Sequence, residues 1–370
     1  MKKRVASPTL YFPNIALLGI HSPYNKTKNI QTYYNEFINL IKSNELPHDK
    51  AIFMKLREIS PVYFLTKGKL EELKKFCQEN EIEQLIISEP LTAQQERNLS
   101  DFLDCQVFDR TRLILEIFEK HAHSAEGKAQ VKIAMLQHQK TRLAGKGIHL
   151  SQQSGIVGKI GGPGETIKER ETRGINKKIL QLKKQLESIK TSRETRRKER
   201  FKSNVPHMCL IGYTNAGKST LLNLLTKSNV LAEDKLFATL DTTTREIYVN
   251  GEKKGVISDS VGFIQQLPHS LIEAFKSTLD ELKYADLLLH VVDISDSNWE
   301  SQIKVVNEIL GELNIQKESL YIFNKKDKMH EDINIIDHLE KFNPHVLTCA
   351  KSKDGIKSLL DYLKKWKRKS

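Results

Sequence analysis

The residues from 212 to 219 have the types and spacing of a phosphate-binding site. The run Gly212-Tyr213-Thr214-Asn215-Ala216-Gly217-Lys218-Ser219 and the adjoining Thr220 fit the pattern GxxxxGK[ST]. A strand-like run precedes it and a helix-like run follows it, as this motif requires. Its glycines let backbone N–H groups surround phosphate oxygens. Lys218 would neutralise the β- and γ-phosphates, and the Ser219 hydroxyl would ligate Mg²⁺.

A second motif lies about forty residues further along the chain. Asp259-Ser260-Val261-Gly262 fits DxxG after an apolar run. We expect Asp259 to hold Mg²⁺ through water and the Gly262 N–H to reach the γ-phosphate. DxxG alone is a weak pattern, but after a phosphate-binding loop it indicates a triphosphate site. Lys218, Asn215 and Gly262 are the expected catalytic groups.

The third and fourth motifs indicate which base is bound. Asn324-Lys325-Lys326-Asp327 fits NKxD, and Cys349-Ala350-Lys351 follows the last strand-like run. The Asp327 carboxylate can accept hydrogen bonds from guanine N1–H and N2, which adenine does not offer. A buried carboxylate left unpaired is costly, so the site would exclude ATP. Lys325 would lie over the base, and the Ala350 N–H would meet guanine O6. Cys349 replaces the more usual Ser, a mild change because that contact is made by the backbone.

Two residues bear on the mechanism. Phe263 follows Gly262, where Ras-type enzymes orient the attacking water with Gln. Phe cannot orient water, so we expect its ring to turn away from the nucleotide and intrinsic hydrolysis to be slow. Asn215 matches the position that coordinates K⁺ in potassium-stimulated GTPases, where the ion replaces an arginine finger. The alternative is that Asn215 only caps the turn.

The first switch segment should lie between 231 and 245. A Thr hydroxyl there must reach Mg²⁺ when the γ-phosphate is present. Thr239 fits best by spacing, and Thr243 and Thr244 are rivals. The run expected at the nucleotide is Phe237-Ala238-Thr239-Leu240-Asp241.

The elements around these motifs predict an open α/β sheet. Six strand-like runs alternate with helices, at 207–211, 244–249, 254–258, 287–292, 319–323 and 345–348. The motifs follow strand ends, where open α/β sheets bind ligands. Residues 204–370 therefore resemble a Ras-like G domain with a six-stranded, mostly parallel sheet.

The preceding half of the chain predicts two further parts. Residues 1–110 alternate strands (15–20, 51–56, 85–87 and 105–108) with helices (34–41, 69–77 and 93–103), which indicates an N-terminal α/β domain. Residues 111–203 predict a helical hairpin: one long helix over 110–143, a glycine-rich tip loop at 145–164 and a returning helix. That helix carries an apolar stripe with coiled-coil-like spacing, Ile175, Ile179, Leu182, Leu186 and Ile189. The charge run 193–200 should be a solvated basic linker.

Composition limits the class of protein. The net charge of +13 favours a polyanionic partner such as nucleic acid. Residues 165–202 hold 14 Lys/Arg against 6 Asp/Glu, a local charge of +8. A charge run is also compatible with a merely solvated face, and the glycine loop with a flexible connector. The four cysteines form no CxxC pair, which fits a reducing cytoplasm, and no run has the length of a membrane span.

Further motifs resemble those of the HflX family of ribosome-associated GTPases. The similar segments are Leu236-Phe237-Ala238-Thr239-Leu240-Asp241, Thr66-Lys67-Gly68-Lys69-Leu70, Asp109-Arg110-Thr111, Glu126-Gly127-Lys128 and Gly162-Pro163-Gly164-Glu165-Thr166. The resemblance implies a monomeric GTPase that binds the large ribosomal subunit, is stimulated by ribosomes and dissociates stalled or idle 70S ribosomes under stress. It implies Mg²⁺ as cofactor and a cytoplasmic location without an integral membrane span. Peripheral membrane association is left open.

The glycine loop is the part expected to approach ribosomal RNA. The residues around it that we expect to contact rRNA are Lys146, His149, Lys159, Gly162, Gly164 and Lys168. Two alternative functions remain open at this stage. One is a ribosome-assembly or RNA-modification GTPase, and the other is an RNA-binding adaptor that binds GTP without hydrolysing it.

Overall fold

The chain divides into two compact units in its computed structural model, residues 1–114 with 141–152 and residues 115–140 with 153–370. The structure describes residues 14–25, 29–47, 50–145, 167–202, 205–226, 236–237, 240, 244–249, 251–266, 268, 271, 279–329 and 338–368. The predicted division into 1–110, 111–203 and 204–370 stays a prediction. No described helix is both long enough and apolar enough to cross a membrane.

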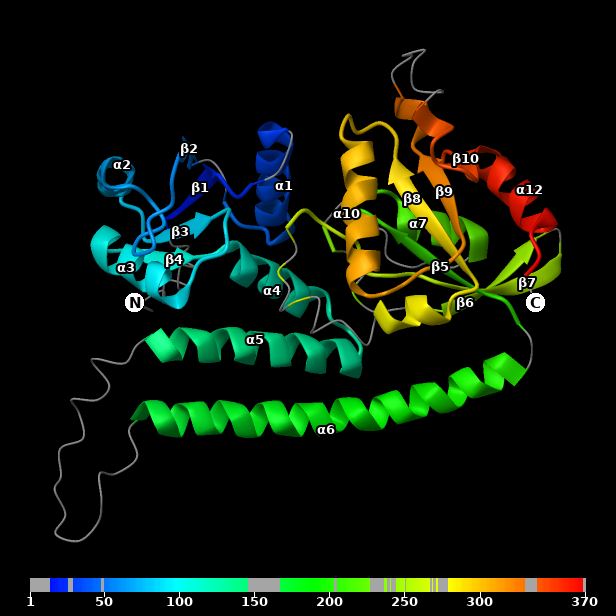
Figure 1. The fold of residues 1–370 in the computed structure, drawn as a ribbon, viewed down its shortest axis with the longest axis horizontal. Coiled ribbons are helices and arrows are strands. Elements are labelled where there is room, and N and C mark those ends of the chain that lie inside the picture. The colour runs from blue at the N-terminus through cyan, green and yellow to red at the C-terminus, as the bar shows by residue number, and fades with distance from the viewer. Residues whose placement is uncertain are drawn as a thin grey trace, which may run out of the picture. The chain divides into compact units, whose positions relative to one another are not determined.

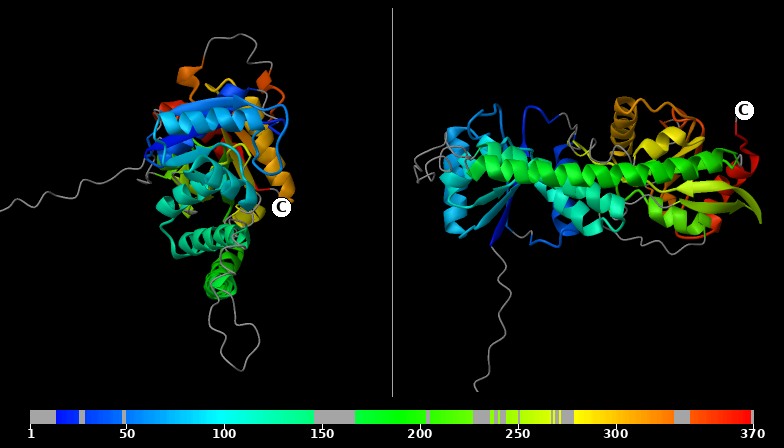
Figure 2. Two further views of the ribbon diagram at one scale, coloured as in Figure 1. Left: turned by 90° about the vertical axis from the view of Figure 1, so that its left-hand side faces the viewer. Right: turned by 90° about the horizontal axis from the view of Figure 1, so that it is seen from below.

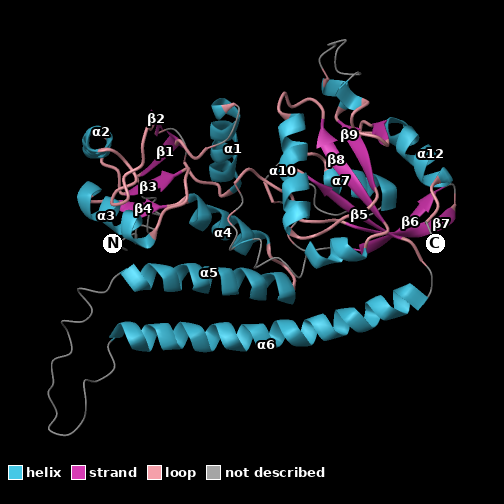
Figure 3. Cartoon of the chain, viewed as in Figure 1, coloured by secondary structure: helices cyan, strands magenta, loops and turns pink. Residues whose placement is uncertain are grey.

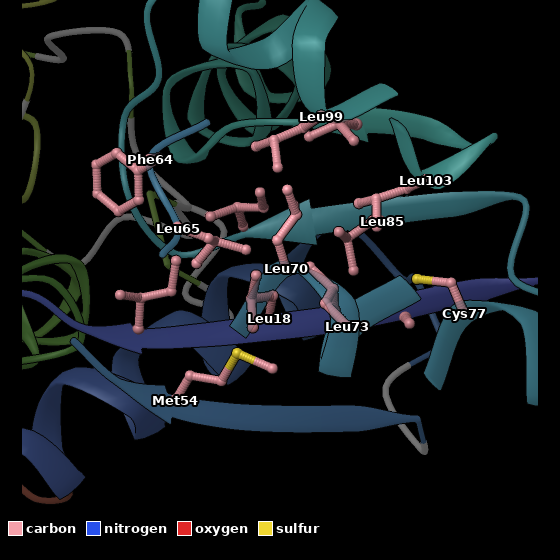
Figure 4. Close-up of a cluster of buried hydrophobic side chains, with 14 of the residues drawn as sticks. Leu18, Met54, Phe64, Leu65, Leu70, Leu73, Cys77, Leu85, Leu99 and Leu103 are labelled. Carbon is pink, nitrogen blue, oxygen red and sulfur yellow. The ribbon is translucent and has the colours of Figure 1, made fainter. Parts of the chain in front are cut away.

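The first unit contains a four-stranded parallel sheet in the order β2-β1-β3-β4 (Figure 1). Its strands are β1 (Ile15–His21), β2 (Ala51–Lys55), β3 (Gln84–Ile87) and β4 (Gln106–Phe108). The connecting helices are α1 (Ile30–Ser43), α2 (Lys67–Glu79) and α3 (Ala93–Leu103). Leucines from strands and helices meet in one core, among them Leu18, Leu73, Leu85 and Leu99 (Figure 4). The predicted strands and helices of this region are all present.

The expected single helix over 110–143 is wrong, because the structure forms α4 (Arg110–His121) and α5 (Ala125–Gly145). Three residues, 122–124, separate them. The Ser124 hydroxyl accepts the Gly127 N–H at 2.9 Å, and so starts a new helix as an N-cap. Periodicity alone did not reveal the break because apolar residues occur on both sides of it.

The returning helix is α6 (Ile167–Lys202), drawn as one long green ribbon in Figure 2. Ile175 on its apolar stripe is buried, and the stripe's other members are half-buried. Leu182 and Gln185 line a groove together with Ala125 and Ala129 of α5, so α5 and α6 pack as neighbours. The charge run 193–200, expected as a linker, has a helical backbone (Figure 3). Lys, Arg and Glu are strong helix formers, which accounts for the continuation.

The second sheet has six strands, as predicted, and their order is β10-β9-β8-β5-β7-β6. They are β5 (His207–Gly212), β6 (Thr244–Val249), β7 (Glu252–Ser258), β8 (Leu287–Asp293), β9 (Ser319–Asn324) and β10 (His345–Leu347). All neighbours are parallel except β6 and β7. The helices include α7 (Lys218–Thr226), α10 (Trp299–Glu312) and α12 (Lys357–Lys365), and apolar clusters lie on both faces of the sheet. This arrangement brings the four motifs to one edge, the carboxyl ends of the strands.

Candidate nucleotide-binding site

The loop between β5 and α7 needs its two glycines for steric reasons. Gly212 and Gly217 have φ of +144° and +95°. A Cβ on Gly212 would lie 2.2 Å from the Val291 carbonyl oxygen, and one on Gly217 would lie 2.3 Å from Asn324 Nδ2. Asn215 also has a positive φ, +60°, which Asn tolerates better than most residues. The loop therefore lies in close contact with the ends of β8 and β9. At its two glycines the backbone has a conformation that residues with a side chain rarely adopt.

Lys218 is a buried cation held by backbone carbonyl groups. Its Nζ donates to the oxygens of Gly212 at 3.2 Å and Tyr213 at 2.7 Å. Burial lowers the pKa of Lys218 to about 8, and the nearby Asp259 carboxylate partly opposes the shift. An anion placed at this ammonium would restore the charged form, because it offsets the desolvation that lowers the pKa.

Ser219 and Asp259 stand together at the start of α7. The Ser219 hydroxyl donates to Asp259 Oδ2 at 3.0 Å, and Asp259 is 1% exposed. A hydroxyl and a carboxylate are hard oxygen donors of the kind that Mg²⁺ prefers. Two of the three residues expected at the metal from the sequence are thus adjacent, and their chemistry fits a Mg²⁺ ion.

The DxxG segment is joined to the phosphate loop by backbone hydrogen bonds. The Thr214 N–H donates to the Phe263 carbonyl oxygen at 2.8 Å, and the Phe263 N–H donates to Gly212 O at 3.2 Å. A Cβ on Gly262 would lie 2.8 Å from Thr214 Cγ2 and 3.0 Å from Lys218 Nζ. The Phe263 ring is buried in the core with Leu279 and other apolar residues. It therefore cannot orient a water molecule, as expected from the sequence.

Asn324 ties the motifs to one another. Its Nδ2 donates to the Ala216 carbonyl oxygen in the phosphate loop at 3.0 Å. Its Oδ1 accepts the Ala350 N–H at 3.0 Å and the Thr348 hydroxyl at 3.3 Å. The side chain is buried. Asn324 thus fixes the distance between the phosphate loop and the segment after β10, a role that an amide with both donor and acceptor can fill.

The residues assigned to the base lie at the surface. Asp327 Oδ2 accepts from Lys351 Nζ at 2.6 Å, and Oδ1 accepts from the Cys349 thiol at 3.2 Å. These donors lower the pKa of Asp327. Asp327 was expected to be a buried carboxylate, but its side chain is 29% exposed and paired. No role was expected for the Cys349 side chain, but its thiol contacts the carboxylate.

Lys325 has a partner that was not predicted from the sequence. Its Nζ lies 2.7 Å from Asp293 Oδ2, and its backbone is left-handed with φ +60°. Asp293 is the last residue of β8, so it lies at the edge of the sheet where the four motifs meet. This position could have identified Asp293 as a site residue from the sequence. Tyr213 was predicted as part of the phosphate loop, and its hydroxyl makes a contact that was not predicted: it accepts the Gln265 N–H at 2.7 Å.

Part of the predicted site lies outside the described residues. This applies to Ala238, Thr239 and Asp241 of the first switch segment, to the rival Thr243, and to the loop residues Lys146, His149, Lys159, Gly162 and Gly164. Thr244 is the first residue of β6, and its hydroxyl lies 2.8 Å from the Ser258 hydroxyl. Phe237 and Leu240 are each 2% exposed, so their side chains point into the protein. Lys168 lies in the first turn of α6.

A P-loop fold with DxxG and NKxD motifs at the ends of a mostly parallel sheet defines a guanine-nucleotide-binding G protein. Three family descriptions match along the chain: "GTP-binding GTPase N-terminal" over 31–119, "GTP-binding GTPase Middle Region" over 121–200 and "50S ribosome-binding GTPase" over 207–325. The chain belongs to the HflX family of GTPases, and it hydrolyses GTP. The alternative of a non-hydrolysing adaptor is therefore rejected.

The relatives that carry this assignment are similar over most of their length. GTPase HflX of Magnetococcus marinus is 41% identical over 336 residues, 90% of this chain and 78% of that one. GTPase HflX of Escherichia coli is 38% identical over 346 residues, 93% and 81% of the two chains. The solved complex of SsGBP with GDP is 26% identical, has a TM-score of 0.51 and covers 95% of this chain and 97% of its own.

Proposed function

We propose that this GTPase binds the large ribosomal subunit, is stimulated by the ribosome and dissociates stalled or idle 70S ribosomes under stress. The match of its G domain to the "50S ribosome-binding GTPase" family supports the first step. The proposed contact with ribosomal RNA is made by α6 and by the glycine loop that precedes it.

The charge distribution on α6 is the structural observation that supports this proposal most directly. Successive residues turn an α-helix by about 100°. Arg170, Arg173, Lys177 and Lys184 therefore share the face opposite the apolar stripe, and all four are exposed. Between 170 and 191 the carboxylate nearest to that face is Glu187, at its edge, about 40° around the helix from Arg173. A long cationic ridge of this kind suits a phosphate backbone, which is recognised mainly by charge.

In the proposed mechanism each motif acts on one part of GTP. Lys218 contacts the β- and γ-phosphates, Gly262 donates its N–H to the γ-phosphate, and Asp327 selects guanine. Ser219 and Asp259 hold Mg²⁺, with Thr239 as the further ligand. The ion neutralises charge on the phosphates. Since Phe263 lies in the core, intrinsic hydrolysis is slow, and the ribosome supplies what orders the water.

Potassium is the proposed aid to catalysis at Asn215. Its exposed side chain sits at the turn of the phosphate loop, with the left-handed backbone described above. Comparing hydrolysis rates in KCl and in NaCl at equal ionic strength tests the assignment. A clear stimulation by K⁺ that is lost in Asn215→Ala is expected. Equal rates in the two salts would leave Asn215 with only the role of capping the turn.

Sucrose gradients of ribosomes with the protein and GTP, GDP or non-hydrolysable GTP analogues test the function as a whole. The GTP form should co-sediment with 50S subunits and reduce the 70S peak, and the GDP form should bind less. Co-sedimentation with precursor particles alone would favour the assembly GTPase instead. Attachment that does not depend on the nucleotide would contradict the proposal.

Substitutions on α6 test the ridge separately. In Lys177→Gln/Lys184→Gln, ribosome affinity should fall and the slope of log affinity against log salt should decrease by about 1.4–1.8, that is 0.7–0.9 per lost phosphate contact. The control Lys178→Gln/Lys183→Gln removes the same charge from other faces of the helix. GTP affinity should stay unchanged in both variants. Equal losses of ribosome affinity in the two would show that only net charge matters.

A further inference from the structure

The phosphate loop contains a buried hydroxyl group whose role is not explained by the fold. Thr214 is 7% exposed, and its Oγ1 forms no hydrogen bond with any residue that the structure describes. Buried polar groups nearly always have a hydrogen-bond partner, and a buried hydroxyl without one destabilises the folded protein. The presence of a hydroxyl at residue 214 therefore needs a reason other than stability.

The surroundings of Thr214 suggest what that reason is. A Cβ on Gly262 would lie 2.8 Å from Thr214 Cγ2 and 3.0 Å from Lys218 Nζ. The Thr214 side chain and the Lys218 ammonium group thus meet at Gly262 of the DxxG motif. In the proposed mechanism this is the position of the γ-phosphate, because Lys218 and the Gly262 N–H both contact that group.

The backbone holds the Thr214 side chain at this position. Residues Tyr213 and Phe263 form a parallel bridge, in which the Thr214 N–H donates to the Phe263 carbonyl oxygen at 2.8 Å. The Tyr213 hydroxyl adds a second link, since it accepts the Gln265 N–H at 2.7 Å. Rotation about χ1 moves the Thr214 hydroxyl only among three staggered positions around its Cβ. The hydroxyl therefore stays beside the position assigned to the γ-phosphate.

We propose that the Thr214 hydroxyl donates a hydrogen bond to an oxygen of the γ-phosphate and so helps the site to distinguish GTP from GDP. The inference rests on the proposed function, which assigns the γ-phosphate to Lys218 and Gly262. A hydrogen bond to a charged oxygen is stronger than one between neutral groups. GDP lacks the γ-phosphate and cannot accept this bond. Thr214 then determines specificity for the third phosphate, whereas Asp327 selects the base.

The variant Thr214→Val tests this proposal, because it removes the hydroxyl and nearly keeps the shape of the side chain. The affinity for a non-hydrolysable GTP analogue, measured by calorimetry without ribosomes, should fall about ten- to a hundredfold. This is the factor expected for the loss of a hydrogen bond to a charged group. GDP affinity should stay unchanged. An unchanged ratio of the two affinities, or an equal loss for GDP, would overturn the proposal.

The variant Thr214→Ser separates the hydroxyl from the packing of the side chain. It keeps the hydroxyl and removes the methyl group, so the ratio of the two affinities should stay close to that of the parent. A loss as large as that in Thr214→Val would mean that the methyl contact with Gly262 matters and the hydroxyl does not.

Stability distinguishes a ligand contact from a structural one. Without nucleotide, Thr214→Val should unfold at the same urea concentration as the parent or at a higher one, because it removes a buried hydroxyl that lacks a partner. The control Thr226→Val removes a hydroxyl that has a partner, since Thr226 Oγ1 donates to the Leu222 carbonyl oxygen of α7 at 2.8 Å. The control should lower the urea midpoint and leave the affinity ratio unchanged.

A urea midpoint that falls further in Thr214→Val than in Thr226→Val would assign the Thr214 hydroxyl to the fold and contradict the proposal. Ribosome co-sedimentation in the gradients tests the proposed function itself, so failure of either idea can be recognised.

Discussion

The two sheets each bury a cation at the first residue of a helix that follows a strand, yet the two cations have opposite partners. Arg110 starts α4 after β4, is fully buried, pairs with the Glu36 carboxylate and stacks 5.0 Å from the Tyr33 ring centroid. Lys218 starts α7 after the phosphate loop and donates to carbonyl groups. The Arg110 charge is neutralised by a carboxylate of the protein, whereas the Lys218 ammonium group is hydrogen-bonded to uncharged carbonyl groups.

This difference shows why similar sheets differ in function. At the ends of β1 and β3, side chains satisfy the backbone: the Ser88 hydroxyl accepts the Ile20 N–H at 2.9 Å, and the Tyr33 hydroxyl donates to Ser88 O at 2.7 Å. In the second sheet, Gly212 and Gly217 give the loop the backbone conformation with which a P-loop binds phosphate. The carboxyl edge of an open α/β sheet can bind a ligand. The residues at that edge decide whether a ligand or the protein's own side chains occupy it.

The largest effect on stability is expected for Arg110→Met. It leaves the buried Glu36 carboxylate without its cation, which costs about 3–5 kcal/mol. Urea unfolding of the full chain should show early loss of the first unit, while GTP affinity persists. The double variant Arg110→Met/Glu36→Leu removes both charges and should recover most of the loss. If the single variant is as stable as the parent, the ion pair does not hold the first unit together.

Lys218→Met should have the contrasting effect. Losing a charge-assisted contact to phosphate costs about 2–3 kcal/mol, so GTP affinity should fall on the order of 100-fold. Stability should not fall, because the cost of burying a cation disappears. Since the pKa of Lys218 is about 8, GTP affinity of the parent should weaken as pH rises through 8. Calorimetry at several pH values checks both points, and Lys304→Met, at an exposed position on α10, provides a surface control.

Glu89 of the first unit should make stability depend on pH. Burial raises its pKa from 4.5 to about 7, against hydrogen bonds and Arg110 that lower it. The folded state therefore binds more protons than the unfolded state between these values, so the unfolding free energy falls as pH rises from about 4.5 to 7. Glu89→Gln should flatten this slope and add on the order of 1–3 kcal/mol at pH 8. Parallel slopes for parent and variant would contradict the assignment.

The smallest effect is expected at Cys349. A hydroxyl is a stronger donor than a thiol, so Cys349→Ser should hold Asp327 better and raise GTP affinity about twofold. Cys349→Ala removes the donor and should lower affinity by a similar factor. Competition between GTP and ATP measures whether the preference for GTP over ATP changes in the same direction as GTP affinity. Identical affinities for Ser, Cys and Ala at this position would limit the role of residue 349 to its backbone.

Much of the fold was predictable because its signals are local. Alternating apolar runs identified the strands of both sheets, and the glycines of the phosphate loop identified a backbone that only they adopt without strain. The helix break at 122–124 was missed, although Ser124 three residues before Gly127 is a cap signal, because the surrounding apolar pattern continues. The helical backbone of 193–200 was missed because charge pattern was weighed above helix propensity.

The sequence by itself determined the four motifs and their order, and hence that the bound nucleotide carries guanine. Each motif is made of residues only a few positions apart. Only the tertiary structure decided which charges are neutralised and which rings meet. Arg110 and Glu36 are 74 positions apart, and the pair of Asp327 with Cys349 and Lys351 spans 22 and 24. Phe118 and Phe237, whose ring centroids lie 4.6 Å from each other, are further apart still along the chain. Such contacts exist only after helices pack on their sheets, because packing, and not local propensity, sets the distance between remote side chains.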